Sequence, residues 1–200
     1  IPQTCARCHS GIYDQYKESV HGAALLGSND QPGGNADVPT CIDCHGVHNI
    51  SDPTTNEFRL ASPTEMCGRC HTDEEKMAKY GISTNVLNTY VGDFHGTTVI
   101  FEQQSPDQET NKPVCFDCHG VHDIKSVDDP QSGIAIKENL LIRCERCHGD
   151  GIPPGFTDSW LSHYTPSAKD YPLVYFVNVF YLVLIPLVLG GMVIFVISDI

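Results

Sequence analysis

The pattern of apolar and polar positions divides the chain into two different parts. Residues 173–197 read LVYFVNVFYLVLIPLVLGGMVIFVI and contain no charged side chain. At about 1.5 Å per residue, a helix of this length would cross the hydrocarbon core of a bilayer, which is about 30 Å thick. The pattern therefore predicts one transmembrane helix over residues 171–198, with the lipid bilayer as a partner. A buried core helix is the alternative.

The first 170 residues show only short stretches with a helical pattern. Residues 10–20, with a Ser cap, residues 72–80, with Thr72 as cap and Gly81 as stop, and residues 137–148 are predicted to be helices. Residues 29–39 and 105–113, rich in Gly, Pro, Asn and Asp, indicate loops. Only short pieces such as residues 97–101 suggest a strand. The predicted fold class is therefore mainly loop with short α-helices, plus the C-terminal membrane helix.

The charge of the chain is strongly acidic. It has 25 Asp and Glu residues against 12 Lys and Arg residues, which gives a formal net charge of −13. Nucleic acids require basic surfaces, so no nucleic-acid partner is expected. The acidic surface either docks a basic partner or only keeps the domain soluble, and both interpretations stay open.

All ten cysteines occur in copies of one motif, C-x-x-C-H. This is the attachment signature of c-type haem. Two thiols in one turn of chain can each add to one vinyl group of the porphyrin, and the next imidazole can then bind the iron from beneath. Five copies predict five haem c groups, attached at Cys5 and Cys8, Cys41 and Cys44, Cys67 and Cys70, Cys115 and Cys118, and Cys144 and Cys147, with His9, His45, His71, His119 and His148 as proximal ligands.

Three other roles for these cysteines are less consistent with the pattern. Zinc sites use four ligands at varied spacings and do not need His after every second Cys. A thioredoxin-type pair would occur once, in an α/β pattern. Five disulfides would suit an exported protein but leave the five adjacent histidines without a role.

Five histidines remain, and five iron atoms would each have one axial position left. The simplest assignment uses every histidine once and makes each haem bis-histidine. The predicted distal ligands are His21, His48, His95, His122 and His163. For any single one of them, an ordinary surface or core side chain is the alternative.

The histidines alternate between two kinds of unit. In an A unit, a short helical stretch separates the attachment site from the second histidine, as from His9 to His21. In a B unit, CHGVH places the second histidine three residues after the first. The order A, B, A, B, A indicates that residues 5–50 and 67–124 are an internal repeat, followed by a half-unit at residues 144–165.

The B units carry a geometric restriction. Side chains three residues apart lie on the same side of a helical turn, about 5–6 Å from one another, and cannot reach opposite faces of one porphyrin. His48 therefore cannot serve the haem of His45, and His122 cannot serve the haem of His119. We expect His48 to serve the haem of His9 or another A-type haem, and His122 to do the same in its repeat.

Residues 1–170 are predicted to form one pentahaem domain. A soluble part of this size needs a packed core, and here the porphyrins would supply much of it, in the way that disulfides or metals stabilise small scaffolds. We expect loops and short helices wrapped around a stack of rings, and an unfolded chain in the absence of haem.

The SVHG and DFHG stretches around His21 and His95, together with the two CHGVH stretches, carry a resemblance. Over roughly residues 5–163 the chain resembles the multihaem c-type cytochromes that include membrane-anchored quinol dehydrogenases, pentahaem nitrite reductase and the tetrahaem acceptor of hydroxylamine oxidation. The resemblance implies close parallel and perpendicular haem pairs that pass electrons. The anchored quinol dehydrogenases have their membrane helix at the N-terminus, whereas this chain has it at the C-terminus.

Bis-histidine iron has no open coordination site, so the expected function is electron relay rather than catalysis. The alternative is a multihaem reductase of nitrite, hydroxylamine or a sulfur oxyanion with one five-coordinate haem, for which His163 is the first candidate to be unbound. In that case Met66 or Met77 could replace a histidine. A polymerising extracellular haem wire is a third hypothesis, which the membrane helix disfavours.

The expected location follows from the haem chemistry. Members of the family receive their haems outside the cytoplasm, which implies a haem domain on the periplasmic or extracytoplasmic face of the cytoplasmic membrane and a C-terminus in the cytoplasm. A single helix cannot build a quinone site alone. Expected partners are therefore integral membrane redox subunits of a respiratory chain and a soluble or membrane-bound electron donor or acceptor.

Overall fold

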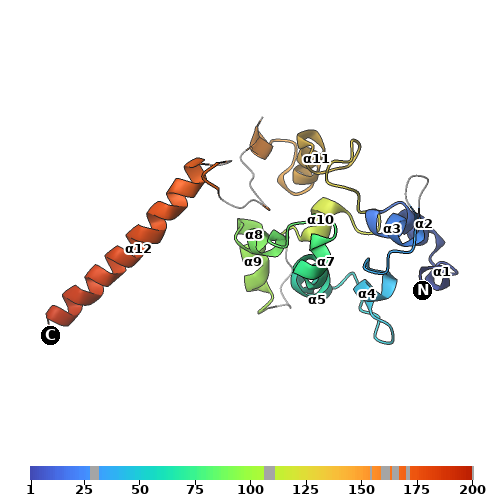
Figure 1. The fold of residues 1–200 in the computed structure, drawn as a ribbon, viewed down its shortest axis with the longest axis horizontal. Helices are drawn as coiled ribbons and strands as arrows, with labels where there is room; N and C mark the ends of the chain where they lie inside the picture. Colours follow the sequence, from blue (N-terminus) through green and yellow to red (C-terminus); the bar gives the residue numbers. More distant parts are fainter. Residues whose placement is uncertain are drawn as a thin grey trace. The chain divides into compact units, whose positions relative to one another are not determined.

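The computed structural model describes residues 1–27, 32–105, 111–153, 155–158, 163, 167–169 and 172–199 (Figure 1). The chain divides into two compact units, Ile1–His163 and Tyr164–Ile200. Among the described residues there are helices, turns and loops but no strand, so the mainly helical and loop fold class is confirmed.

The helices of the first unit are short. Most have four to nine residues, and the longest has 12. In chain order they are α1 (Pro2–Cys5), α2 (Ser10–Lys17), α3 (Val20–Leu26), α4 (Cys41–His45), α5 (Asn56–Ala61), the π-helix η1 (Ser62–Cys67), α6 (Gly68–His71), α7 (Glu74–Ala78), α8 (Val86–Val91), α9 (Phe94–Glu102), α10 (Cys115–His119), α11 (Lys137–His148) and the 3-10 helix η2 (Phe156–Asp158).

The internal repeat is visible as two helix pairs of the same construction. In the first repeat α2 packs against α3, and in the second α8 packs against α9. Ser19 caps α3 by accepting a hydrogen bond from the Gly22 amide, and Asp93 caps α9 by accepting one from the His95 amide. Each cap begins a new helix that carries a predicted distal histidine in its first turn.

A close backbone approach fixes the angle within each pair. A Cβ atom on Gly22 would lie 1.8 Å from the carbonyl oxygen of Tyr16, and one on Gly96 would lie 2.1 Å from that of Tyr90. Only glycine allows the second helix to come this near to the first. The Gly of the SVHG and DFHG stretches therefore sets the position of the preceding histidine.

Two of the predicted helices differ from the structure at their ends. The helix predicted over residues 10–20 is α2 followed by α3, because the Ser19 side chain caps a second helix, and Ser10 is the first helical residue rather than the cap. Asp73, not Thr72, caps α7, while the Thr72 hydroxyl donates to the Gly68 carbonyl of α6. Gly81 does follow the end of α7, with a φ of 65°.

The third predicted helix is confirmed, since α11 covers Lys137–His148. The short strand suggested for residues 97–101 is wrong, because these residues belong to α9. Packing decides this segment: Val99 is fully buried against Leu60 and Val114, and this contact outweighs the preference of β-branched residues for strands. The predicted loops at 29–39 and 105–113 fall partly outside the described residues, and their described parts contain no helix.

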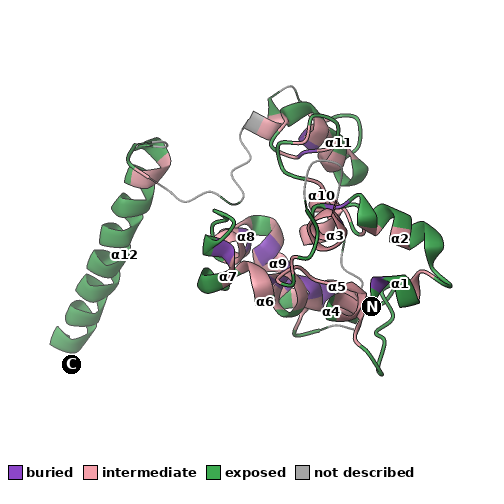
Figure 2. Cartoon of the chain, turned by 45° about the vertical axis from the view of Figure 1, so that its right-hand side comes forward, coloured by how far each residue is buried: buried purple, intermediate pink, exposed green. Residues whose placement is uncertain are grey.

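The apolar core of the first unit is small. Its central cluster joins Leu60, Val99 and Val114, with Phe116 packed against them. In Figure 2 buried residues form only isolated patches among half-buried and exposed ones. A domain of this size would ordinarily bury about two thirds of its unfolded surface. The polypeptide alone therefore supplies too little core, which agrees with a domain whose interior is completed by another group.

The second unit contains one long helix, α12 (Pro172–Ser198), with 27 residues and a mean hydropathy of 2.7 over its most apolar window. It is long and apolar enough to cross a membrane, and its most apolar window is exposed throughout. The helix predicted over residues 171–198 is thus confirmed as a helix, with residue 171 lying outside the described part.

The approach of α9 to α8 generates a stability prediction. Gly96→Ala places a methyl group against the backbone of Tyr90 and should lower the free energy of unfolding by about 1–3 kcal/mol. Gly11→Ala, in the exposed part of α2 with no atom within 4 Å, is the matched control and should be neutral or stabilise by up to about 1 kcal/mol. Chemical denaturation of the full-length protein in detergent measures both. Equal effects would mean that the close approach is absent in solution.

Candidate haem sites

Each C-x-x-C-H motif lies on one helical turn. α4 and α10 consist of the second and fourth motifs, α11 ends with the fifth, and the third runs from the last residue of η1 through α6. In the first motif the His9 amide donates to the Cys5 carbonyl at 2.9 Å, which is also a helical turn. Residues i, i+3 and i+4 share one face of a helix, so both thiols and the imidazole point to the same side. This is the geometry that thioether attachment requires.

The α4 and α10 turns are built alike in the two repeats. The carboxylate of Asp43 accepts a hydrogen bond from the Thr40 amide, and that of Asp117 accepts one from the Val114 amide. Gly46 and Gly120 follow the attachment histidines with φ values of 84° and 89°, a left-handed conformation that glycine adopts without strain. The glycine of CHGVH therefore ends the helix and turns the chain away.

The tyrosines of α2 and α8 hold these turns in place. The Tyr16 hydroxyl donates to the Pro39 carbonyl at 2.8 Å, and the Tyr90 hydroxyl donates to the Pro113 carbonyl at 2.9 Å. Burial raises the pKa of Tyr16 to about 12, with nearby Cys41 adding to the shift, so the hydroxyl remains a donor. Each repeat thus ties its helix pair to the chain just before its B unit.

Eight histidines form four ring pairs, and each pair joins one attachment histidine to one predicted distal histidine. The distances between ring centres are 6.4 Å for His71 and His21, 6.2 Å for His45 and His122, 6.3 Å for His148 and His95, and 6.2 Å for His119 and His163. The two members of every pair belong to different units of the A, B, A, B, A series.

These distances fit two imidazoles on opposite sides of one iron. A metal–imidazole bond is about 2.0 Å long and the ring centre lies about 1 Å beyond the nitrogen, which gives about 6 Å between two ring centres. Ordinary aromatic pairs span a wider range, about 4.5–7 Å. Four pairs within 6.2–6.4 Å, all of the mixed kind, are better explained by ligand pairs than by chance packing.

A cavity lies beside one of these pairs. It has a volume of about 370 Å³, and its lining includes Leu25 on α3, Cys70 on α6 and the apolar side chains of Val38 and Ile42. α3 carries His21 and α6 carries His71. The lining also contains the charged residues Asp37, Asp43 and Lys76, so the cavity is only partly apolar, and neither His21 nor His71 lines it.

Burial keeps several of these imidazoles neutral. It lowers the pKa of His21 to about 4, with a smaller contribution from His71. Burial also lowers the pKa of His119 to about 4, with further contributions from His163 and His71. A histidine must be neutral to bind a metal, so these environments favour the ligand form over the protonated one.

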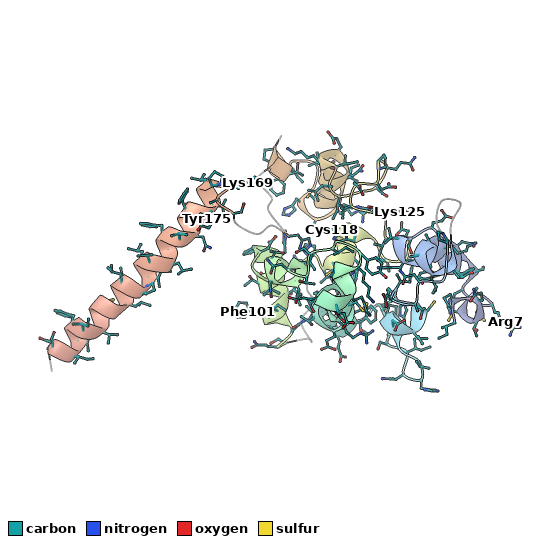
Figure 3. The ribbon with its side chains drawn as sticks, in the orientation of Figure 1. Arg7, Phe101, Cys118, Lys125, Lys169 and Tyr175 are labelled. Atoms are coloured by element: carbon teal, nitrogen blue, oxygen red, sulfur yellow. The ribbon has the colours of Figure 1, made fainter. Side chains whose placement is uncertain are left out.

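Attachment sites that are neighbours in the sequence also lie close together in the structure. The thiols of Cys5 and Cys41 interact, as do those of Cys67 and Cys115, which raises the pKa of Cys67 and lowers that of Cys115. Arg69 of the third site donates to the Asp43 carbonyl of the second at 2.9 Å. α10 packs against both η1 and α11, so the fourth site contacts the third and the fifth (Figure 1), with Cys118 labelled in Figure 3.

The other roles considered for the cysteines receive no support. All ten are free thiols in the structure, so none is in a disulfide. Within the described residues no three His, Cys, Asp or Glu side chains converge on one point as a tetrahedral zinc site requires. Four of the five thiol pairs are instead followed directly by a histidine that belongs to one of the four ring pairs.

Two of the predicted distal histidines, His48 and His122, do not lie against the histidines that the sequence analysis expected. His122, expected at an A-type haem, lies against His45, the attachment histidine of a B unit. His48, expected at the haem of His9 or another A-type haem, is exposed and makes no ring contact with another histidine. His163, the first candidate to be unbound, instead lies against His119, and its Nδ1 is 3.3 Å from the Thr89 hydroxyl.

Aromatic residues beside the imidazoles were not found from the sequence. Phe58 stacks on His45 at 5.7 Å between ring centres, and Phe156 lies 5.4 Å from His148. No spacing rule connects these phenylalanines to the motifs. Tyr16 and Tyr90 do have a signal, because they recur at the same position of the two repeats together with Pro39 and Pro113.

Comparison of the chain with protein families, with curated proteins and with solved structures gives no match. The residues and their geometry therefore carry the functional argument.

The two repeats supply a matched test of how α10 is held. Asp117 caps α10 and also pairs with Arg59, which donates to the Lys112 carbonyl as well. The Asp43 carboxylate accepts from the amide and the hydroxyl of Thr40, and among the described residues no arginine forms an ion pair with it. Asp117→Ala should therefore lower the free energy of unfolding by about 1 kcal/mol more than Asp43→Ala. Denaturation of both variants, with and without Arg59→Ala, measures the difference. An unchanged difference in the Arg59→Ala background would contradict the role of the pair.

Proposed function

We propose that the chain is a membrane-anchored pentahaem c-type cytochrome that relays electrons. The observation that carries the proposal is the set of four mixed histidine pairs, each at a spacing that suits one iron. Five haem c groups would be attached through the ten cysteines, with His9, His45, His71, His119 and His148 as proximal ligands. The distal ligands of four haems would be His21, His95, His122 and His163.

Axial saturation argues for transfer of electrons rather than for catalysis. Iron with two imidazole ligands offers no position to a substrate, and the change of charge on the iron is then the only chemistry left. The protein's part is to position the rings, exclude water and tune the potentials. The low pKa values of His21 and His119 fit this role, since both side chains remain neutral ligands over the physiological pH range.

The contacts between attachment sites suggest the route of the electrons. Site 1 adjoins site 2 through Cys5 and Cys41, site 2 adjoins site 3 through Arg69 and Asp43, and α10 adjoins the sites on either side of it. A relay in the order of the sequence follows, from the haem of His9 to the haem of His148 or in the reverse direction. The last site is the one nearest in sequence to α12.

The proposed location follows from attachment and anchoring together. Thioether attachment of haem belongs outside the cytoplasm in the family that the chain resembles, so the unit Ile1–His163 would face the periplasm and α12 would end in the cytoplasm. Partners would be integral membrane redox subunits in contact with α12 and an electron donor or acceptor at the haem unit. The net charge of −13 favours a basic surface on that second partner.

A multihaem reductase is the second candidate. It is kept because His9 makes no ring contact with another histidine, so one of the five irons is not accounted for by the four pairs. Reduction of nitrite, hydroxylamine or a sulfur oxyanion by the protein with reduced viologen as donor would favour the enzyme over the relay.

The four pairs can be tested one at a time. The purified protein should contain five haems by pyridine haemochrome assay, with at least four low-spin ferric signals in its electron paramagnetic resonance spectrum. His95→Ala should convert one low-spin haem to high spin, because His148 then has no partner. Phe94→Ala, at the exposed neighbour that also contacts the His95 ring, should leave the spectrum unchanged. A low-spin spectrum in His95→Ala would contradict the pairing.

The route can be tested by removing a haem from the middle of it. The protein is tethered to a gold electrode through Gln3→Cys, at an exposed residue near the first site, and the electrons exchanged at fast scan rates are counted. We expect five electrons in this parent and two after Cys67→Ala with Cys70→Ala, although four haems remain. Removal of the terminal haem by Cys144→Ala with Cys147→Ala is the control and should leave four. Four electrons in both variants would contradict a route in sequence order.

A further inference from the structure

The four histidine pairs obey one rule. His21 of the first A unit lies against His71 of the second, and His95 of the second lies against His148 of the third. An attachment histidine in an A unit is therefore paired with a histidine from the preceding A unit. Among the histidines that the structure describes, His9 belongs to none of these ring pairs.

The B units follow a complementary rule. His122 of the second B unit lies against His45 of the first, and His163 of the last A unit lies against His119 of the second B unit. The attachment histidine of each B unit is thus paired with a histidine from a later unit.

The position of His122 depends on contacts that its loop makes. The Val20 amide at the start of α3 donates to the Ile124 carbonyl at 2.8 Å, and the Lys125 side chain donates to the Glu18 carbonyl. Figure 3 shows Lys125 beside the helices of the first repeat. The loop after α10 is therefore held on α3 by the residues that directly follow His122.

The corresponding loop of the first repeat is not held in this way. The hydrogen bonds that residues 47–54 make to described residues stay within residues 45–55, as from the Ser51 amide to the His45 carbonyl at 3.1 Å. Ile50, at the position of the half-buried Ile124, is 71% exposed, although Val47 and its equivalent Val121 are both 57% exposed. In Figure 1 the loop after α4 extends away from the helices around it. No contact of a described residue holds His48 over the haem of His9.

The first attachment site is exposed at Cys8 and His9, as the fifth is at Cys147 and His148, whereas the attachment histidines of the second, third and fourth sites are half-buried. The ring of His45 is already paired with His122, so it is not available to a second iron.

We propose that the haem attached at Cys5 and Cys8 has one open axial position, and that it binds small ligands of haem iron such as cyanide or nitric oxide while the other four haems do not. The inference rests on the proposed attachment of five haems. It assigns the ligand site to one end of the proposed relay, where the haem of His9 is followed by only one neighbouring site. His48 is then a free, exposed imidazole rather than a distal ligand.

The test compares the same position of the two repeats. Full-length ferric protein in detergent is titrated with cyanide, and bound cyanide per chain is counted from the optical change and from the loss of high-spin electron paramagnetic resonance signal. We expect one bound cyanide per chain in the wild-type protein, one in His48→Ala and two in His122→Ala. Of these two histidines, only His122 lies against an attachment histidine.

Each other result has a defined meaning. No cyanide in the wild-type protein but one in His48→Ala would overturn the inference, because His48 would then be the sixth ligand of the first haem. No cyanide in either protein would also overturn it, since another group would occupy the position. A haem count below five, measured before the titration, or an unchanged cyanide count in His122→Ala would overturn the proposed bis-histidine scheme itself.

Discussion

The structure of the unit Ile1–His163 depends on one kind of contact, the pairing of a histidine from a C-x-x-C-H motif with a histidine from another unit of the A, B, A, B, A series. Each of the four pairs joins segments far apart in sequence. With iron between the two imidazoles, each pair would become a cross-link, because the porphyrin that holds the iron would be attached to the chain through two thioethers. The apolar cluster of Leu60, Val99 and Val114 is too small to order a unit of this length alone.

The internal repeat explains how such pairs arise without a large core. One construction occurs twice: a capped helix that carries a histidine, a glycine that lets the helix approach its neighbour, and a tyrosine that ties the pair to the next attachment turn. Because each histidine reaches into another unit, the repeats hold one another. The proposed ligand site lies at the first attachment site, whose His9 belongs to none of the four pairs among the described residues.

The same arrangement connects structure to function. Attachment sites that touch in sequence order would bring five rings into one row, and paired imidazoles would leave most irons without an exchangeable position. A row of saturated haems suits the relay of electrons, whereas one open iron at its end would give the row a site that responds to small ligands. The acidic surface and the apolar helix α12 suit a basic redox partner and a bilayer, respectively.

The sequence by itself determined the five C-x-x-C-H motifs with their five histidines, the five further histidines, the repeated segments, the long apolar helix α12 and α11. These follow from local spacing and composition, which act within one turn or one segment. The sequence also predicted that the two histidines of a B unit serve different haems, and the structure places His122 away from His119 as that prediction requires.

Only the tertiary structure decided which histidines meet. His122 lies at His45 because Ile124 and Lys125 dock its loop on the first repeat, and residues 97–101 are helical because Val99 fills the core beside Leu60. The split of residues 10–20 at Ser19 likewise depends on the approach of Gly22 to Tyr16. Such contacts join residues distant in sequence, and spacing along a chain contains no information on which of several equivalent partners a side chain reaches.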